Sequence, residues 1–260
     1  MDDMKTYLAV LTILLYAFLF VFGSSVGSFL GVVIERVPKG EPFVRGRSHC
    51  PACSRQLRGW EMFPVFSYLL LGGKCRTCKA RITPRCLLLE VLGGGFAMLS
   101  AVAFGLTWQA LAAFALLCAL TVVTFIDLGT MEIPNGVLLF MLIPAAVLAA
   151  ITPETGILSH VIGFFCVSVP LLLITLAIPG AFGGGDIKLM AVCGLALGWR
   201  STLVGFFIAL LLGGAYGIWA LSAKKLGRKE HFAFGPCLAF GAAASLFAGE
   251  TILNWYLRLF

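Results

Sequence analysis

Long apolar segments are the feature that most constrains this chain. Of its 260 residues, 60% are hydrophobic and only 12% are charged, whereas a soluble domain has about 25% charged residues. A helix of about 20 apolar residues is long enough to cross the hydrocarbon core of a bilayer. The sequence therefore predicts an all-α polytopic membrane protein rather than a soluble domain.

The apolar runs predict about eight transmembrane helices. The first run is longer than the apolar region of a cleavable signal, which has about 7–15 residues, so it is expected to remain in the protein. The run at 187–199 is short, and its sequence is compatible with a tilted or re-entrant segment or with fusion to the next helix. The expected spans are 7–34, 85–105, 108–126, 134–151, 156–179, 187–199, 201–222 and 233–255.

Positive charge is concentrated in two loops. Of the 19 Lys and Arg residues, eleven lie between Arg36 and Arg85 and four lie at 224–229. Loops rich in Lys and Arg face the cytoplasm, and counting helices between the two loops places both on the same side. The charge is explained by topology and by lipid headgroups, so we expect no nucleic-acid partner.

A cysteine-rich loop divides the chain into three predicted parts: a first transmembrane helix (1–37), a cytoplasmic loop (38–84) and a transmembrane bundle (85–260). The loop holds two CxxC pairs, 21 residues apart, formed by Cys50, Cys53, Cys75 and Cys78. Two such pairs are typical of a four-thiolate zinc site. With four protein ligands the ion would be structural, stapling a loop too small to bury its own core.

Other interpretations of the cysteines stay open from the sequence alone. The two pairs could form disulfides or a redox site, but a cytoplasmic location argues against stable disulfides. His49 is a possible substitute ligand. The remaining cysteines lie in or beside apolar runs, where small core residues are expected: Cys86, Cys118, Cys166, Cys193 and Cys237.

Two aspartates stand at the ends of apolar runs, where a charge is costly. Asp127 ends one run, and Asp186 follows three glycines; both fall on the predicted cytoplasmic face. Two carboxylates that share a site cannot both ionise cheaply, so one keeps a proton and the pair can activate water. The alternative is that each aspartate only caps a helix. Lys188 is expected to extend towards the headgroups.

The remaining acidic residues near this face are interpreted as ordinary loop or helix-end charges, and only secondarily as contacts for a basic substrate. They are Glu35, Glu61, Glu90 and Glu132.

Several motifs stand around the two aspartates and the cysteine pairs. They are GSFLGVVIERVP at 27–38, FIDL at 125–128, GGGDIKL at 183–189 and FGPCLA at 234–239. With the two CxxC pairs, they resemble bacterial type IV prepilin peptidases, the membrane aspartyl proteases of GxGD type in peptidase family A24. GGGDIKL is similar to the GxGD-x-K-L signature of that family, and FIDL to its other aspartate motif. The resemblance covers nearly the whole chain, in order.

The resemblance implies a bacterial inner-membrane enzyme with two activities. It implies cleavage of a short basic leader after glycine from type IV prepilins or type II secretion pseudopilins, with Asp127 and Asp186 as the catalytic pair facing the cytoplasm. It also implies N-methylation of the new N-terminal residue, usually phenylalanine, by S-adenosylmethionine. The four cysteines carry over as the zinc ligands, whereas no residues are assigned to the methyl donor.

The chain departs from the family pattern at several positions. Gly31 stands where the family often has asparagine, Met62 begins the segment that often reads Asn-Ile-Pro, and Cys86 stands in a segment that often reads Arg-Tyr-Pro. Asn135 follows Ile-Pro in place of the family's Leu-Pro-Asp. The missing polar side chains favour, as an alternative, a peptidase without methyl transfer. A non-catalytic, zinc-stapled scaffold of a pilus or secretion system is the other alternative.

Overall fold

The computed structural model describes residues 2–44, 50, 52–152, 156–223 and 232–259. In these ranges no β-strand is found, apart from an isolated bridge between Lys74 and Arg81. The predicted all-α class is confirmed. The helices are α1 (Asp2–Arg36), η1 (Val37–Lys39), η2 (Gly59–Met62), α2 (Phe66–Leu70), α3 (Pro84–Phe104), α4 (Trp108–Thr130), α5 (Asn135–Ile151), α6 (Gly156–Cys166), α7 (Ser168–Ala177), α8 (Gly184–Ser222) and α9 (Gly235–Leu257).

The expected spans correspond closely to these helices. Among the described residues, six helices are long and apolar enough to cross a membrane, and α5 is a shorter apolar helix. The expected spans 187–199 and 201–222 are joined in α8, which is interrupted at Gly198, where φ is 74° and ψ is 164°. Counting α5 and the two parts of α8 separately, the fold roughly matches the expected eight. The basic residues at 224–229 lie outside the described residues.

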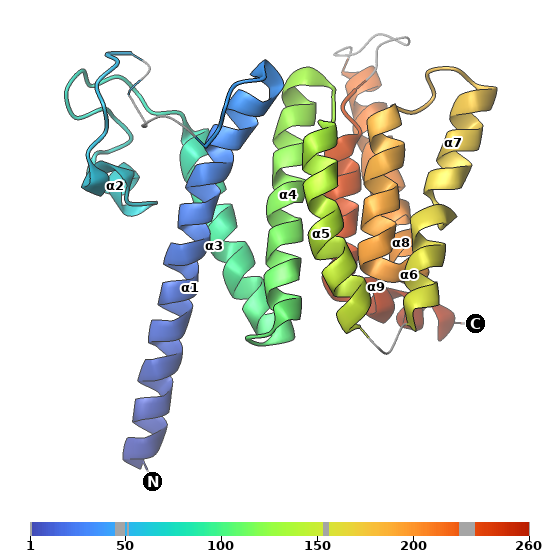
Figure 1. The fold of residues 1–260 in the computed structure, drawn as a ribbon, viewed down its shortest axis with the longest axis horizontal. Helices are drawn as coiled ribbons and strands as arrows, with labels where there is room; N and C mark the ends of the chain where they lie inside the picture. The colour runs from blue at the N-terminus through green and yellow to red at the C-terminus, as the bar shows by residue number, and fades with distance from the viewer. Residues whose placement is uncertain (1, 45–49, 51, 153–155, 224–231, 260) are drawn as a thin grey trace. The chain divides into compact units, whose positions relative to one another are not determined.

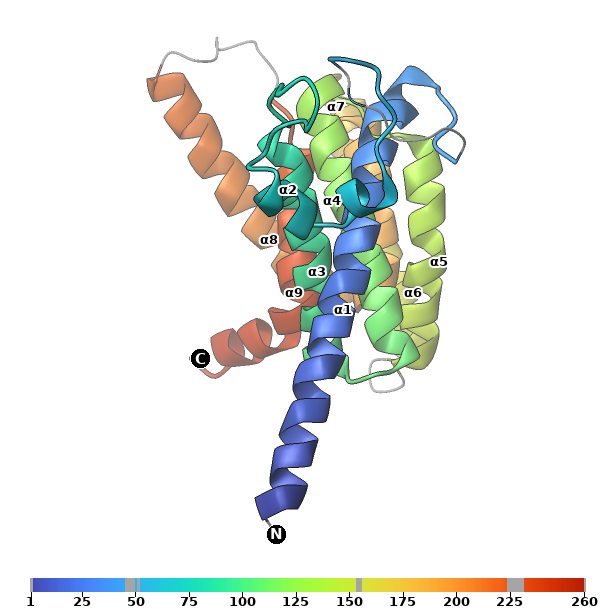
Figure 2. The same cartoon turned by 90° about the vertical axis from the view of Figure 1, so that its left-hand side faces the viewer.

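The chain forms two compact units, an N-terminal unit (Met1–Ala110) and a C-terminal unit (Leu111–Phe260). In the N-terminal unit, α1 and α3 pack side by side, and the cysteine-rich segment lies near the end where α1 finishes and α3 begins (Figure 1). Figure 2 shows the same arrangement from the side, with α2 beside the ends of these two helices.

Close helix packing in both units depends on paired glycines, as is common where apolar helices approach in a membrane. At each pair, an added Cβ would overlap the carbonyl oxygen of the glycine opposite, so a larger residue would push the helices apart. The pairs are Gly23–Gly93 between α1 and α3, Gly163–Gly194 between α6 and α8, and Gly205–Gly241 between α8 and α9.

The C-terminal unit is organised around α8, which packs against α5, α6, α7 and α9. The kink at Gly198 is a conformation that favours glycine, and it is flanked by polar contacts. Buried His160 of α6 lies 2.8 Å from the Leu195 carbonyl through Nδ1 and 3.1 Å from Thr152 Oγ1 through Nε2. The contact with Leu195 ties α6 to α8 beside the kink.

Candidate functional site

Asp127 lies in the last turn of α4 and is buried, with 5% of its surface exposed. The helix ends three residues later at Thr130, and the next residue, Met131, has φ of 55° and donates its N–H to the Asp127 carbonyl at 2.8 Å. The side chain does not cap its own helix. Instead its Oδ2 accepts a 2.9 Å hydrogen bond from the N–H of Gly235, the first residue of α9, where a carboxylate is favourable.

Asp186 lies in the first turn of α8 and is partly exposed. Its Oδ2 accepts a 3.3 Å hydrogen bond from the N–H of Gly183. The neighbouring Gly185 has a packing role, because a Cβ there would lie 2.9 Å from the Cβ of Ile133. The glycine run therefore brings the start of α8 against the segment that follows α4.

The two aspartates line one pocket of about 740 Å³, which lies within the C-terminal unit. Each uses only Oδ2 to hold a backbone N–H, and in the described part of the chain Oδ1 of each has no hydrogen-bond partner. The helix-cap interpretation thus accounts for one oxygen of each carboxylate. The second oxygens are left for water or a substrate, which is the arrangement that acid–base chemistry at a shared pocket requires.

The rest of this pocket is aromatic and glycine-rich. Phe182 packs against Phe234 with ring centroids 6.1 Å apart, and Phe232 meets Phe234 edge to face at 6.2 Å. Gly213 and Gly214 of α8 also line the pocket, so no side chain of α8 fills it there. An apolar polypeptide can approach the aspartates closely along such a surface.

Lys188 was expected to extend towards the headgroups, but the structure gives it a polar partner within the C-terminal unit. Its Nζ donates a 2.9 Å hydrogen bond to Oδ1 of Asn135, at the start of α5. Asn135 is one of the positions that depart from the family pattern. The contact ties the first turn of α8 to α5 and so helps to position Asp186.

The second site is formed by Cys50, Cys53, Cys75 and Cys78, whose Sγ atoms all lie within 4.8 Å of one another. The Cys50 and Cys78 Sγ atoms are 3.8 Å apart. Sulfurs at about 2.3 Å from a tetrahedral zinc ion are separated by about 3.8 Å. The four thiols therefore fit a tetrahedral ion, and His49 lies outside the described residues.

The two CxxC pairs fold in the same way. Cys50 N–H donates to the Arg55 carbonyl at 2.9 Å, and Cys75 N–H donates to the Ala80 carbonyl at 2.8 Å. The residue after each pair has positive φ, 54° at Ser54 and 58° at Lys79. The loop is thus two matching knuckles that aim their sulfurs at a common centre.

Backbone N–H groups in the knuckles favour thiolates. The N–H groups of Cys78 and Thr77 lower the pKa of Cys75 to about 6, and those of Ala52 and Cys53 lower the pKa of Cys50. The Ala80 N–H lowers the pKa of Cys78, but desolvation and the neighbouring thiols outweigh it and raise that pKa to about 11. Four thiolates at this spacing repel one another, and a divalent cation is the partner that lets all four ionise.

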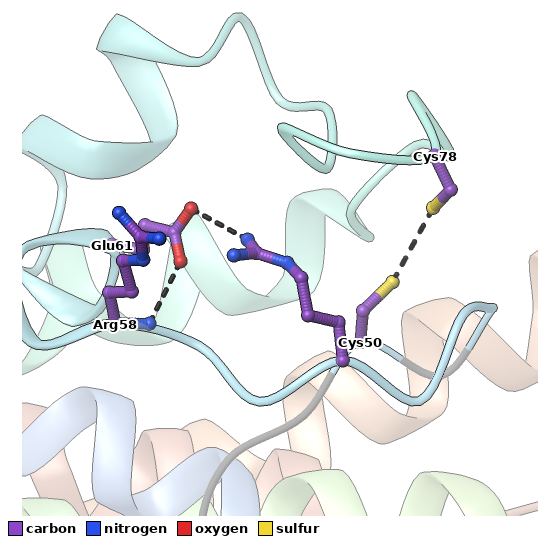
Figure 3. A network of polar contacts seen from close by, with 5 residues as sticks. Cys50, Arg58, Glu61 and Cys78 are labelled. Atoms are coloured by element: carbon purple, nitrogen blue, oxygen red, sulfur yellow. Dashed lines mark hydrogen bonds and ion pairs between the residues drawn. The ribbon is translucent and has the colours of Figure 1, made fainter.

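Two glutamates interpreted as ordinary charges are buried, and this expectation was wrong. Both Glu61 carboxylate oxygens are engaged: Oε1 by Arg55 at 2.7 Å and Oε2 by the Arg58 N–H at 2.8 Å (Figure 3). Glu90 of α3 is 9% exposed, and its Oε2 accepts the Val65 N–H at 2.7 Å. Burial carries no local sequence signal, and the Val65 partner of Glu90 is 25 residues away, so these roles were missed.

Glu61 and Glu90 line a cavity of about 600 Å³ within the N-terminal unit. We call it the α1–α3 pocket; Gly27, Gly31, Glu61, Tyr68, Glu90 and neighbouring side chains line it. Gly31, Met62 and Cys86, which depart from the family pattern, all line this pocket.

The five cysteines outside the cluster were expected in the core, and the structure divides them. Cys118 and Cys193 are buried, Cys166 and Cys237 are partly buried, and Cys86 is exposed. The core interpretation is therefore wrong for Cys86, which lies in the first turn of α3 beside the cysteine-rich segment.

Comparison with known proteins identifies the family of this chain. The bacterial peptidase A24 N-terminal domain matches residues 21–104, and the type IV leader peptidase family matches residues 114–218. A Bacillus subtilis protein named prepilin leader peptidase/N-methyltransferase is 31% identical over 93% of this chain and 97% of its own length. One of the same name from Burkholderia pseudomallei is 34% identical over 90% of this chain and 85% of its own length.

No solved structure matches the chain. The two matched domains together run from residue 21 to residue 218, and the relatives align along nearly the whole chain. The chain therefore belongs to the type IV leader peptidase family, with a bacterial A24 N-terminal domain.

Proposed function

We propose that this chain is a prepilin leader peptidase and N-methyltransferase of the aspartyl type. The observation that carries the peptidase activity is the pocket that Asp127 and Asp186 share, in which each presents an oxygen with no partner in the described chain. The substrates are type IV prepilins or pseudopilins, whose basic leader is cut after a glycine. The names and alignments of the relatives support this assignment.

In the proposed reaction, the two carboxylates share one proton. The ionised aspartate removes a proton from a water molecule as that water attacks the scissile carbonyl carbon. The protonated aspartate first donates a hydrogen bond to the carbonyl oxygen, and a proton then passes to the leaving nitrogen as the C–N bond breaks. The Gly235 and Gly183 N–H groups hold each carboxylate by Oδ2, which leaves Oδ1 to do this work.

The chain is a multi-pass membrane protein. We propose that it lies in the bacterial inner membrane with the aspartates on the cytoplasmic side, as the two basic loops predict. The four-cysteine cluster is proposed to hold one structural zinc ion. When bound, the ion cross-links the two knuckles of a segment too small to be stable by burial alone.

The decisive test is cleavage of a prepilin by the purified chain in detergent or lipid. Asp127→Asn and Asp186→Asn keep the size of the side chain but remove the acid–base group, so each is expected to lower the rate by about 10²-fold or more. Asp3→Asn, on an exposed residue at the start of α1, is the matched control. Cleavage at the wild-type rate by either site variant would remove the aspartyl mechanism.

Methyl transfer needs a separate measurement, because Gly31 and Met62 lack the polar groups that the family often has. Mass spectrometry of the mature substrate separates cleavage from methylation in one preparation. A new N-terminal residue that carries one methyl group supports both activities. An unmodified amine after complete cleavage, with S-adenosylmethionine present, would leave a peptidase without methyl transfer.

A further inference from the structure

We propose that the α1–α3 pocket binds S-adenosylmethionine, the methyl donor. This inference rests on the proposed methyltransferase function and assigns it a site. The pocket lies within the N-terminal unit and does not share a lining residue with the pocket that holds the aspartates. Its volume of about 600 Å³ falls in the range of small-molecule sites, which is about 300–1,000 Å³.

Glu90 identifies the charge that the ligand carries. Its side chain is nine-tenths buried, and Oε2 is engaged by the Val65 N–H. Within the described residues, Oε1 has no hydrogen-bond partner and the carboxylate has no ion-pair partner. A buried carboxylate needs a compensating cation. S-adenosylmethionine supplies one, because it carries a sulfonium and an ammonium group.

Glu61 also lines the pocket but differs from Glu90 in charge balance. Arg55 pairs with Glu61 at 2.7 Å, and the Arg58 N–H takes its other oxygen. The negative charge of Glu61 is therefore already neutralised by Arg55. Glu35, the third carboxylate in the lining, pairs with Lys39 at 3.6 Å, so among the described residues Glu90 is the carboxylate left to receive a cationic ligand.

Backbone strain beside Glu90 supports a binding role. Val65 has φ of 62° and ψ of −54°, and the Phe66 N–H donates to the Pro64 carbonyl at 2.6 Å. This is a γ-turn with positive φ, a rare and strained conformation for a β-branched residue. Glu90 holds the turn through the Val65 N–H, and the same hydrogen bond fixes the carboxylate with Oε1 free. Strain of this kind gathers at ligand-binding positions.

The shape of the pocket also suits the ligand. A Cβ at Gly31 would have one neighbour within 4 Å, Leu89 Cδ1 at 3.6 Å, so the missing side chain leaves open volume. Tyr68 supplies an aromatic wall for the adenine. Its ring packs against Gly73, where an added Cβ would lie 2.9 Å from the Tyr68 hydroxyl. A basic leader peptide is a poorer fit, since six extended residues span about 20 Å.

Binding of radiolabelled S-adenosylmethionine to the purified full-length chain, by equilibrium dialysis, tests this site without a reaction. Gly31→Phe fills the pocket without changing charge and is expected to abolish saturable binding. Glu90→Gln keeps the shape and removes the charge, and is expected to weaken binding about 10-fold or more, as for the loss of a hydrogen bond to a charged group. Gly95→Phe is the control, because nothing lies within 4 Å of its Cβ position.

Zinc content and the thermal midpoint verify that each variant is folded, and Glu90→Gln tests the pocket without added volume. Wild-type affinity in both folded site variants would overturn the inference. The inference would also be overturned if the site variants lost binding of a basic leader peptide but still bound S-adenosylmethionine. If the wild-type chain methylates its product while both variants bind normally, only the site is wrong. If the wild-type chain neither cleaves nor methylates, the proposed function itself fails.

Discussion

The backbone N–H of Gly235 donates a 2.9 Å hydrogen bond to Oδ2 of Asp127, across 108 residues of sequence. This contact joins the end of α4 to the start of α9 and orients a buried carboxylate towards the pocket it shares with Asp186. It also explains why position 235 is glycine, since a Cβ there would lie 2.6 Å from Oδ2 and 3.0 Å from Cγ of Asp127.

Gly235→Ala is therefore expected to displace the Asp127 carboxylate. Misplacement of a catalytic group by about 1 Å can cost about 10²-fold, so we expect a fall of that order in the leader-cleavage rate, with zinc content unchanged. Gly129→Ala is the matched control, because nothing lies within 4 Å of its Cβ position although it is close to Asp127 in sequence. Equal rates for the two variants would show that the Gly235 contact does not position the aspartate.

Loss of one cluster thiol is expected to empty the metal site. Cys50→Ser replaces a buried thiolate ligand with a poor one, so bound zinc, measured by elemental analysis, should fall from about one ion per chain towards zero. Cys166→Ser, which removes a thiol that donates to the Gly163 carbonyl in α6, should keep its zinc. The cluster would be excluded as the zinc site if Cys50→Ser retained a full ion.

Glu61 gives the cysteine-rich segment a defined pH dependence. The Arg58 N–H, followed by the Arg55 guanidinium, lowers the pKa of Glu61 below its ordinary value of 4.5. A carboxylate with a lowered folded-state pKa stabilises the fold above its unfolded pKa, and this contribution disappears as the pH falls through the folded-state value. The thermal midpoint of the wild type should exceed that of Glu61→Gln at neutral pH, and the gap should close below about pH 4.5.

The control for this measurement is Glu41→Gln, on an exposed residue outside the α1–α3 pocket. It is measured at each pH, because acid also releases zinc from thiolates. Its midpoint should follow that of the wild type throughout. A gap between wild type and Glu61→Gln that widens on acidification would contradict the assigned ion pair.

Relief of strain at Val65 should stabilise the protein. A strained backbone conformation costs about 1–3 kcal/mol, and glycine accepts positive φ without that cost. After allowing for the greater freedom of glycine in the unfolded chain, Val65→Gly should raise the free energy of unfolding by about 1 kcal/mol. Val44→Gly, at an exposed valine without positive φ, should not. Denaturant titration compares them, and destabilisation by Val65→Gly would contradict the strained turn.

Much of this protein could be predicted from the sequence. The apolar runs predicted the helices to within a few residues, because the length of a spanning helix is set by the bilayer. The CxxC spacing indicated which four cysteines converge, because a spacing of two residues fixes the local geometry of each cysteine pair. The positions of Asp127 and Asp186 at the ends of apolar runs, where a charge is costly, indicated that both carboxylates have a specific role.

The tertiary structure decided the features that depend on distant partners. The Gly235 N–H donates a hydrogen bond to Asp127, the Val65 N–H donates one to Glu90, and Asn135 accepts one from Lys188. No regular spacing in the sequence relates the two members of any of these pairs. Glu61 and Glu90 looked like surface charges because local polarity does not report burial. Hydrophobic periodicity records only which residues avoid water, whereas the hydrogen bonds that orient a carboxylate are set by how helices far apart in the chain pack.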